Sequence, residues 1–93
     1  MHVAVLHVRL HVPQASSLKE KRQVIKSILD RARSRYRVAA AEVDEQDIHR
    51  QAVLGFAAVS GDRHHAEEVI TKLLEGLRMH PVARIIEHEL DVF

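Results

Sequence analysis

The hydrophobic residues of this chain change their period in a fixed order, and this order constrains the fold more than any other feature of the sequence. Strand-like alternation comes first, then a long helical period, two strand-like runs, a second helical period and a last strand-like run. The segments cover residues 2–12, 17–35, 37–43, 50–59, 62–80 and 82–93. With right-handed crossovers, this β-α-β-β-α-β order predicts one ferredoxin-like α+β domain over residues 1–93. Such a domain has a four-stranded antiparallel sheet with two helices on one face.

The first strand-like run is typical of a central strand. One of its faces carries alternate apolar residues from Ala4 to Val12, and the other face begins with Val3 and Val5. A strand with two apolar faces is better placed inside a sheet than at its edge. Pro13 ends the run, because proline has no N–H to donate to a neighbouring strand.

The two helical periods have clear start and stop signals. Ser17 followed by Glu20 forms a capping-box pattern at the start of the first helix. We expect the second helix to begin after the break at Ser60-Gly61-Asp62, with Asp62 or Ser60 as its N-cap, and to stop near His80, because Pro81 follows.

The charge of the chain is concentrated in the first helix and the residues just after it. The formal net charge is only +1, but residues 17–37 contain eight basic and two acidic side chains. The rest of the chain holds six basic residues and eleven acids, so the two parts carry +6 and −5. An asymmetry of this kind favours a polyanionic partner more than the total charge does.

A row of cations along the first helix is the sharpest functional prediction. Four of them recur at helical spacing and share one flank of the helix. With Lys21 they make up the candidate nucleic-acid-binding residues, which are Lys19, Lys21, Arg22, Lys26 and Arg33. A row like this can follow a phosphate backbone and makes binding depend on salt. The alternative interpretation of the same residues is a solvated helix face that keeps a small protein soluble.

Several blocks of the sequence resemble a known family. The blocks are Ser17-Leu18-Lys19-Glu20-Lys21-Arg22, Ala41-Glu42-Val43-Asp44, Gln46-Asp47, and Gln51-Ala52-Val53-Leu54-Gly55 with Val59-Ser60-Gly61-Asp62. In this order they resemble the YlxP-like family of small bacterial proteins of unknown function, over nearly the whole chain. The resemblance implies a ferredoxin-like fold and a gene setting shared with translation-initiation and ribosome-maturation factors, which points to RNA or ribosomes. His49 departs from the pattern, which has a bulky aromatic after the Gln-Asp pair, and the family offers no established catalytic residue.

The sheet face that no helix covers is a second candidate site. Val3, Val5, His7 and Arg9 of the first strand are expected there. RNA-recognition domains of this topology stack bases on aromatic side chains of the central strands, but here we expect Phe56 to point into the core. An apolar face without aromatics favours a homodimer interface, because an exposed patch of that size needs cover.

The chain lacks the residues and motifs that several kinds of catalytic and metal sites require. The chain has no cysteine, which excludes disulfides, Cys-ligated zinc and thiol catalysis. It also has no glycine-rich phosphate loop, no G-x-S-x-G and no H-E-x-x-H motif. The acidic group Glu42, Asp44, Glu45 and Asp47 lacks the spacing of an EF-hand loop. We therefore expect no enzyme activity, no bound metal and no cofactor.

The first residues lack the features of a signal peptide, and no apolar run is long enough to span a bilayer. We therefore expect a cytoplasmic protein without a membrane partner. The leading hypothesis is a non-enzymatic, homodimeric binding module for RNA or a ribosomal particle. Two alternatives remain, an ACT-like small-molecule regulatory module with its ligand at the dimer interface and a protein-interaction domain.

Overall fold

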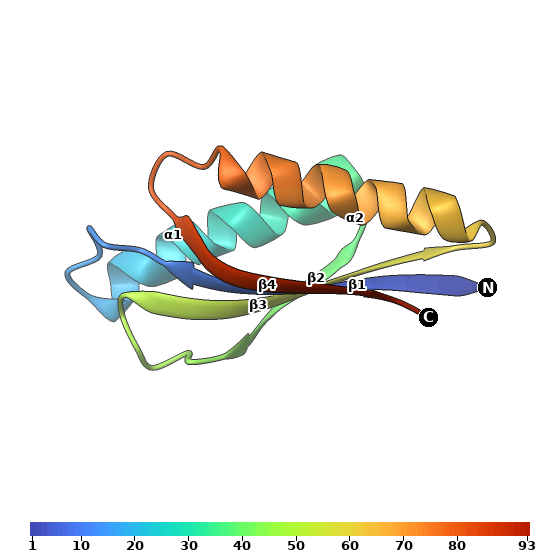
Figure 1. Cartoon of the computed structure of the whole chain (residues 1–93). Helices are drawn as coiled ribbons and strands as arrows, with labels where there is room; N and C mark the ends of the chain where they lie inside the picture. The colour runs from blue at the N-terminus through green and yellow to red at the C-terminus, as the bar shows by residue number, and fades with distance from the viewer.

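The computed structural model describes residues 1–93 and places four strands in one antiparallel sheet with the order β2-β3-β1-β4. Two helices lie on one face of this sheet and leave the other face open (Figure 1). In chain order the elements are β1 (His2–His11), α1 (Leu18–Arg31), η1 (Ala32–Tyr36), β2 (Ala39–Asp44), β3 (Gln51–Ser60), α2 (Arg63–Arg78) and β4 (Arg84–Val92). The predicted ferredoxin-like fold is confirmed, with β1 and β3 as its central strands.

The core lies between the sheet and the two helices. The even-numbered residues of β1 and β3 face the helices, and among them Leu6 and Leu54 are fully buried and Phe56 is almost so. The helices contribute apolar stripes that include Ile25 of α1 and Ile70 of α2. The predicted inward direction of Phe56 is therefore confirmed. No helix is both long enough and apolar enough to cross a membrane.

The first helix ends differently from the prediction. The sequence indicates one uninterrupted helix over residues 17–35, but α1 stops at Arg31 and continues as the π-helical turn η1. Arg37 then takes a left-handed conformation, with φ of 55°, and turns the chain toward β2. Hydrophobic periodicity cannot detect this change, because a single π turn contains too few apolar residues to shift the pattern.

The last strand carries a bulge that alters which residue faces the helices. Strict alternation would put Ile86 on the same face of β4 as Leu90 and Val92, which pack against the core, but the register shifts between Arg9 and Leu10 of β1, so that Ile85 pairs with Leu10. Ile86 is accordingly 52% exposed, whereas Ile85 packs against the core. An irregular extra residue of this kind exchanges the two faces of a strand beyond it.

The connection between β2 and β3 leaves the plane of the sheet on the side away from the helices (Figure 1). It begins at Glu45, which has a left-handed backbone with φ of 58°. A residue in this conformation reverses the chain sharply. The connection thereby reaches residues on both faces of the sheet.

Candidate functional site

The first turn of α1 is fixed by side chains on both sides of its cap. The Ser17 hydroxyl accepts a hydrogen bond from the backbone N–H of Glu20 at 3.2 Å. The Glu20 carboxylate accepts hydrogen bonds from the backbone N–H and the hydroxyl of Ser16, and these bonds lower the pKa of Glu20 below its usual range. This is the predicted capping box with its return contact displaced by one residue. The cap sets where the helix begins and so decides which side chains face solvent.

The outer side of α1 carries the α1 cation row, which consists of Lys19, Arg22, Lys26 and Arg33. All four residues are exposed, as the periodicity predicts. Lys19 and Arg22 form no ion pair, so their charged groups are open to solvent. These two side chains meet the basic requirement for contacting a phosphate, which is a cation that no carboxylate already neutralises.

The other two members of the row are partly engaged by the protein itself. Lys26 Nζ lies 2.6 Å from a carboxylate oxygen of Asp30, and this hydrogen bond is the main reason that the pKa of Asp30 is lowered. Arg33 contacts the other oxygen of Asp30 at 3.4 Å and donates to the Ala40 carbonyl of β2 at 2.6 Å. Exposed pairs of this type are worth less than about 1 kcal/mol, so a phosphate can displace them.

Lys21 was predicted to contact phosphate, and this prediction is wrong. Its side chain is completely buried beneath the start of α1. The Nζ atom donates to Glu42 Oε2 at 3.0 Å and lies within hydrogen-bond distance of three backbone carbonyls, at 2.9 Å from Glu45, 3.2 Å from Gln46 and 3.1 Å from Gln51. A buried ammonium must be paired and hydrogen-bonded, and this set of acceptors satisfies it fully. Lys21 therefore anchors the β2–β3 connection and cannot reach a partner.

Three arginines extend the exposed positive charge beyond the predicted row. Arg31, Arg35 and Arg37 are exposed, and none forms an ion pair with a carboxylate. Arg31 is the last residue of α1, Arg35 lies in η1, and Arg37 comes directly after η1. The charge count of residues 17–37 already included them, but the helical-wheel row did not, because Arg31 and Arg35 lie on a different flank of the helix and Arg37 lies beyond its end. Without the buried Lys21, this segment still exposes seven cations against two acids.

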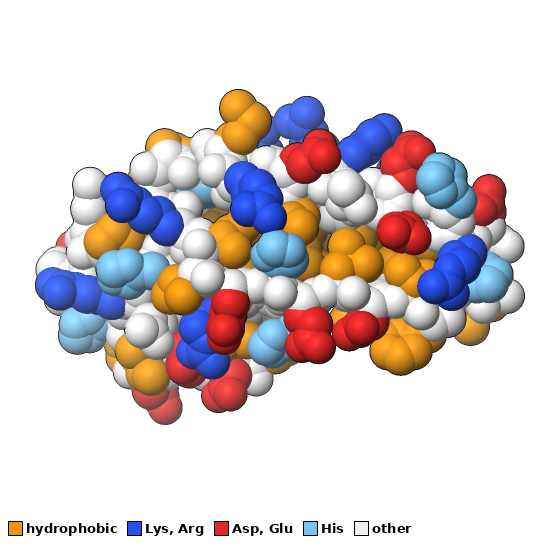
Figure 2. Space-filling view, viewed as in Figure 1, with side chains coloured by type: hydrophobic (Ala, Val, Ile, Leu, Met, Phe, Trp, Pro, Cys, Tyr) orange, Lys and Arg blue, Asp and Glu red, His pale blue; other side chains and the backbone are white.

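The predicted dimer-interface residues share the open face of the sheet. Val3, Val5 and Arg9 are half-buried and His7 is exposed. Their partners on β3 also face away from the helices and are Val59, Ala57, Gly55 and Val53. This orientation of β3 agrees with the predicted inward direction of Phe56. Acidic side chains gather along the neighbouring edge strand β4 (Figure 2), where Glu87, Glu89 and Asp91 lie opposite Arg9, His7 and Val5.

Arg9 differs from the other open-face residues because its guanidinium is already paired. It donates to the carboxylates of Glu45, in the β2–β3 connection, and of Glu87 on β4, the latter at 3.0 Å. These two contacts, Glu45 first, raise the pKa of Arg9 above its usual value. Val53 lies opposite Arg9 on β3 and is only 1% exposed. Through its two carboxylate partners, Arg9 links β1 to the β2–β3 connection and to β4 on the open face.

The acidic residues at the end of β2 do not converge. Glu42 turns toward Lys21 on the helix side, whereas the Glu45 carboxylate turns toward Arg9 on the open side. Asp44 accepts a hydrogen bond from the backbone N–H of Glu45. No three acidic or histidine side chains in the structure come together as a metal-binding group.

Comparison with known proteins gives a family and one curated relative. The model of the family described as "Protein of unknown function (DUF503)" matches residues 3–90. The chain is 37% identical over 67 residues to "Uncharacterized protein YlxP" of Bacillus subtilis (strain 168), which covers 72% of this chain and 73% of the relative. The resemblance to the YlxP-like family is thereby confirmed.

Two solved structures share the arrangement of elements. "Structural Genomics, protein YJCS" superimposes with a TM-score of 0.55 at 10% identity and covers 96% of both chains. A de novo designed protein with a ferredoxin fold, LFR1 1, gives a TM-score of 0.53 at 13% identity and covers 100% of this chain and 84% of the design. At these identities the likeness concerns the fold alone.

Proposed function

This chain belongs to the DUF503 family of proteins of unknown function, and from its surface we propose that it is a non-enzymatic binding module that contacts structured RNA or a ribosomal particle through α1. The observation that carries this proposal is the solvent side of α1 and η1, which exposes seven cations and only two acids over residues 17–37. Lys19 and Arg22 offer charged groups that no carboxylate occupies. The first helix holds Lys19, Arg22 and Lys26 in a row along one flank, which suits the repeated charges of a nucleic-acid backbone.

The open face of the sheet is less suited to RNA than the helical side. The open face of the sheet lacks exposed aromatic side chains on β1 and β3, and the acids of β4 border it. Base stacking on the sheet therefore has no platform, and the acidic edge repels phosphate. The helical layer is the side that fits a polyanion.

We also propose that the open face is the interface of a homodimer. Val43 and Val59 are 50% and 65% exposed there, beside the half-buried Val3 and Val5. A two-fold axis across the strands would stack the apolar centres of the two open faces on one another. Dimerisation in this way leaves both α1 helices free on the outside.

Fluorescence anisotropy with labelled ribosomal RNA fragments across a salt series tests the RNA proposal. The wild-type affinity is expected to fall steeply with salt and to exceed the affinity for a DNA duplex of equal length. In the triple variant K19Q/R22Q/K26Q we expect weaker binding to every RNA and a salt slope smaller by about 3, one for each lost phosphate contact.

The matched control R63Q/K72Q/R84Q removes the same charge from α2 and β4 and should leave the salt slope close to that of the wild type. Equal losses in the two triple variants would show that only net charge matters and would overturn the assignment to α1. Absence of wild-type binding at low salt would overturn the RNA proposal itself.

A further inference from the structure

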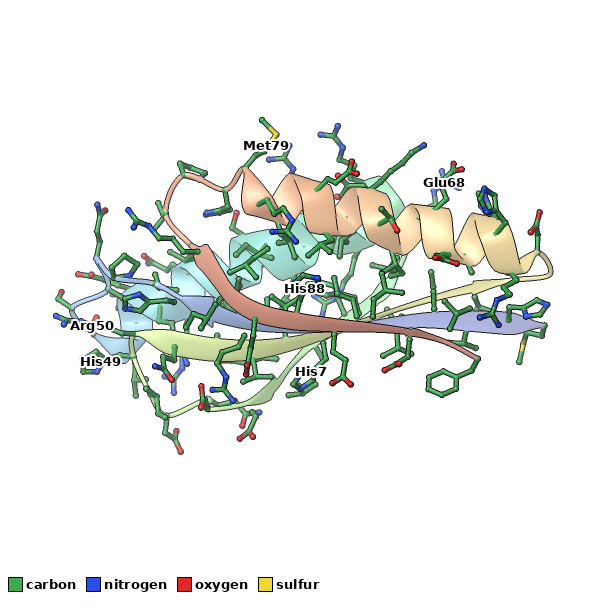
Figure 3. All side chains as sticks on the ribbon, viewed as in Figure 1. His7, His49, Arg50, Glu68, Met79 and His88 are labelled. Carbon is green, nitrogen blue, oxygen red and sulfur yellow. The ribbon has the colours of Figure 1, made fainter.

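A groove runs between the two helices on the side of the helical layer away from the sheet. Its floor consists of four buried apolar residues, Ile28 and Ala32 from the first helix and Leu73 and Leu77 from α2. The exposed Met79 stands at its rim and points away from the sheet (Figure 3). The groove encloses about 320 Å³, which is at the lower end of the range for small-molecule sites.

Two local features, a glycine in α2 and the π turn η1, shape one wall of this groove. Gly76 of α2 has no side chain, and the Tyr36 hydroxyl oxygen lies only 2.8 Å from the position that a Cβ atom at Gly76 would occupy. Tyr36 belongs to the π turn η1, which widens the end of the first helix. π turns inside helices frequently occur at functional sites.

The polar residues around the groove are basic or neutral. Arg31 and Arg35 line it, no acidic residue does, and neither guanidinium has a carboxylate partner. Arg35 lies over the ring of Tyr36, with its Cζ atom 5.8 Å from the ring centroid. Two unpaired guanidiniums beside an apolar floor suit a ligand that is partly apolar and partly anionic.

His80 adds a hydrogen-bond donor at the same place. Its Nδ1 atom accepts hydrogen bonds from the backbone N–H groups of Val82 and Ala83, at 3.1 and 3.0 Å. The ring proton is therefore on Nε2, which is left to donate. Free carbonyls at the C-terminal end of α2 would repel an anion. The carbonyls of Gly76 and Leu77, however, accept hydrogen bonds from backbone N–H groups, which reduces this repulsion.

We propose that the interhelical groove binds a small organic anion with a flat apolar body and a phosphate or carboxylate group. The apolar body lies on the floor of Ile28, Leu73 and Leu77, and Arg31 and Arg35 hold the anionic group. Arg31 and Arg35 also count among the seven exposed cations of the RNA proposal, but the triple variant that tests that proposal changes Lys19, Arg22 and Lys26, none of which lines the groove. The groove is also separate from the open face of the sheet.

Phenyl phosphate is the test probe, because it combines a flat ring with a phosphate. In a titration followed by amide chemical shifts, we expect saturable binding in the millimolar range, with shifts confined to the groove. Benzoate should bind at the same place, whereas phenol and inorganic phosphate, each carrying half of the recognised features, should bind more weakly. A carboxylate or a phosphate ligand is distinguished by which of the two charged probes binds better.

The variant R31Q/R35Q should weaken phenyl phosphate binding by about ten-fold or more. The matched control K19Q/R22Q removes the same charge from the same helix and should change the affinity by less than about two-fold. Because Ser27 is exposed at the groove, S27F should block binding without disturbing the core. Absence of saturable binding by both charged probes, or equal losses in the two double variants, would overturn the proposal.

Discussion

Two cations hold the same short connection from opposite faces of the sheet. Lys21 binds backbone carbonyls of Glu45 and Gln46 from the helix side, and Arg9 binds the Glu45 carboxylate from the open side. Glu45, with its left-handed backbone, therefore contacts one cation through its carbonyl and the other through its side chain. At the scale of single residues, these two basic side chains serve the fold and are removed from the surface charge available to a partner.

Replacing Lys21 by methionine should reduce the free energy of unfolding by about 3 kcal/mol or more, because Glu42 and three carbonyls lose their buried donor. The double variant K21M/E42Q should lose less than the sum of the two single variants, since it no longer leaves an unpaired carboxylate. Urea unfolding of the four proteins measures both quantities. A loss of less than about 1 kcal/mol for K21M would show that water replaces the ammonium.

His80 makes the stability depend on pH in one direction. Burial, and secondly the charge of Arg31, lowers the pKa of His80 below its usual value of 6.5. The unfolded chain therefore takes up a proton at a higher pH than the folded chain does. Stability is complete above about pH 6.5 and is lost as the pH falls from there through the lower folded pKa.

The variant H80N keeps a side-chain acceptor for Val82 and Ala83 but does not titrate. When the pH is lowered from about 7.5 to about 5, it passes through the pKa of histidine in the unfolded chain, about 6.5. Over this range the free energy of unfolding of the wild type should fall by more than that of H80N. Urea unfolding at the two values gives the comparison. Parallel losses in the two proteins would contradict a role for this imidazole.

The elements of the helical layer meet at a close contact between η1 and α2. Gly76 lies inside α2, where glycine normally costs helix stability relative to alanine. Here its missing side chain gives room to the hydroxyl of Tyr36. The π turn, the glycine and the groove between the helices therefore belong to one local arrangement.

Alanine at position 76 should not give the gain of about 1 kcal/mol that the replacement of a helical glycine normally brings, because the new methyl group meets the Tyr36 hydroxyl. In the background Y36F that oxygen is absent, and G76A should then stabilise the protein. Thermal unfolding of wild type, G76A, Y36F and the double variant completes the cycle. Additive effects would mean that Tyr36 moves aside without cost.

The whole molecule has two unlike sides. The side formed by α1 and η1 is basic, whereas the open face of the sheet is apolar in its centre and acidic along β4. Because the net charge is only +1, this separation governs how the protein meets a charged partner more than its total charge does. The two partners proposed above, a polyanion and a second copy of the chain, would lie on opposite sides of the molecule and would not compete.

If the open face forms a dimer, V59E should weaken it by about ten-fold or more, because the new carboxylate is buried without a partner. Val59 is exposed in the single chain, so the substitution leaves the core intact. Sedimentation equilibrium against the control Q23E, which adds the same charge on α1, measures the effect. A wild-type protein that is monomeric at all concentrations, or a V59E dimer of normal affinity, would exclude this interface.

Local patterns in the amino-acid sequence predict the order of the elements, the capped start of α1, the two faces of the central strands and the concentration of positive charge in residues 17–37. These properties depend on local periodicity and neighbouring residues, so they can be derived from the chain alone. The burial of Lys21, the bulge in β4 and the groove between η1 and α2 depend instead on contacts between segments that are distant in the sequence. The acceptors of Lys21 come from β2, the β2–β3 connection and β3, and the groove needs Gly76 of a distant helix. A helical period says on which side of a helix a lysine lies, but only the packed neighbours decide whether water or protein surrounds its ammonium group.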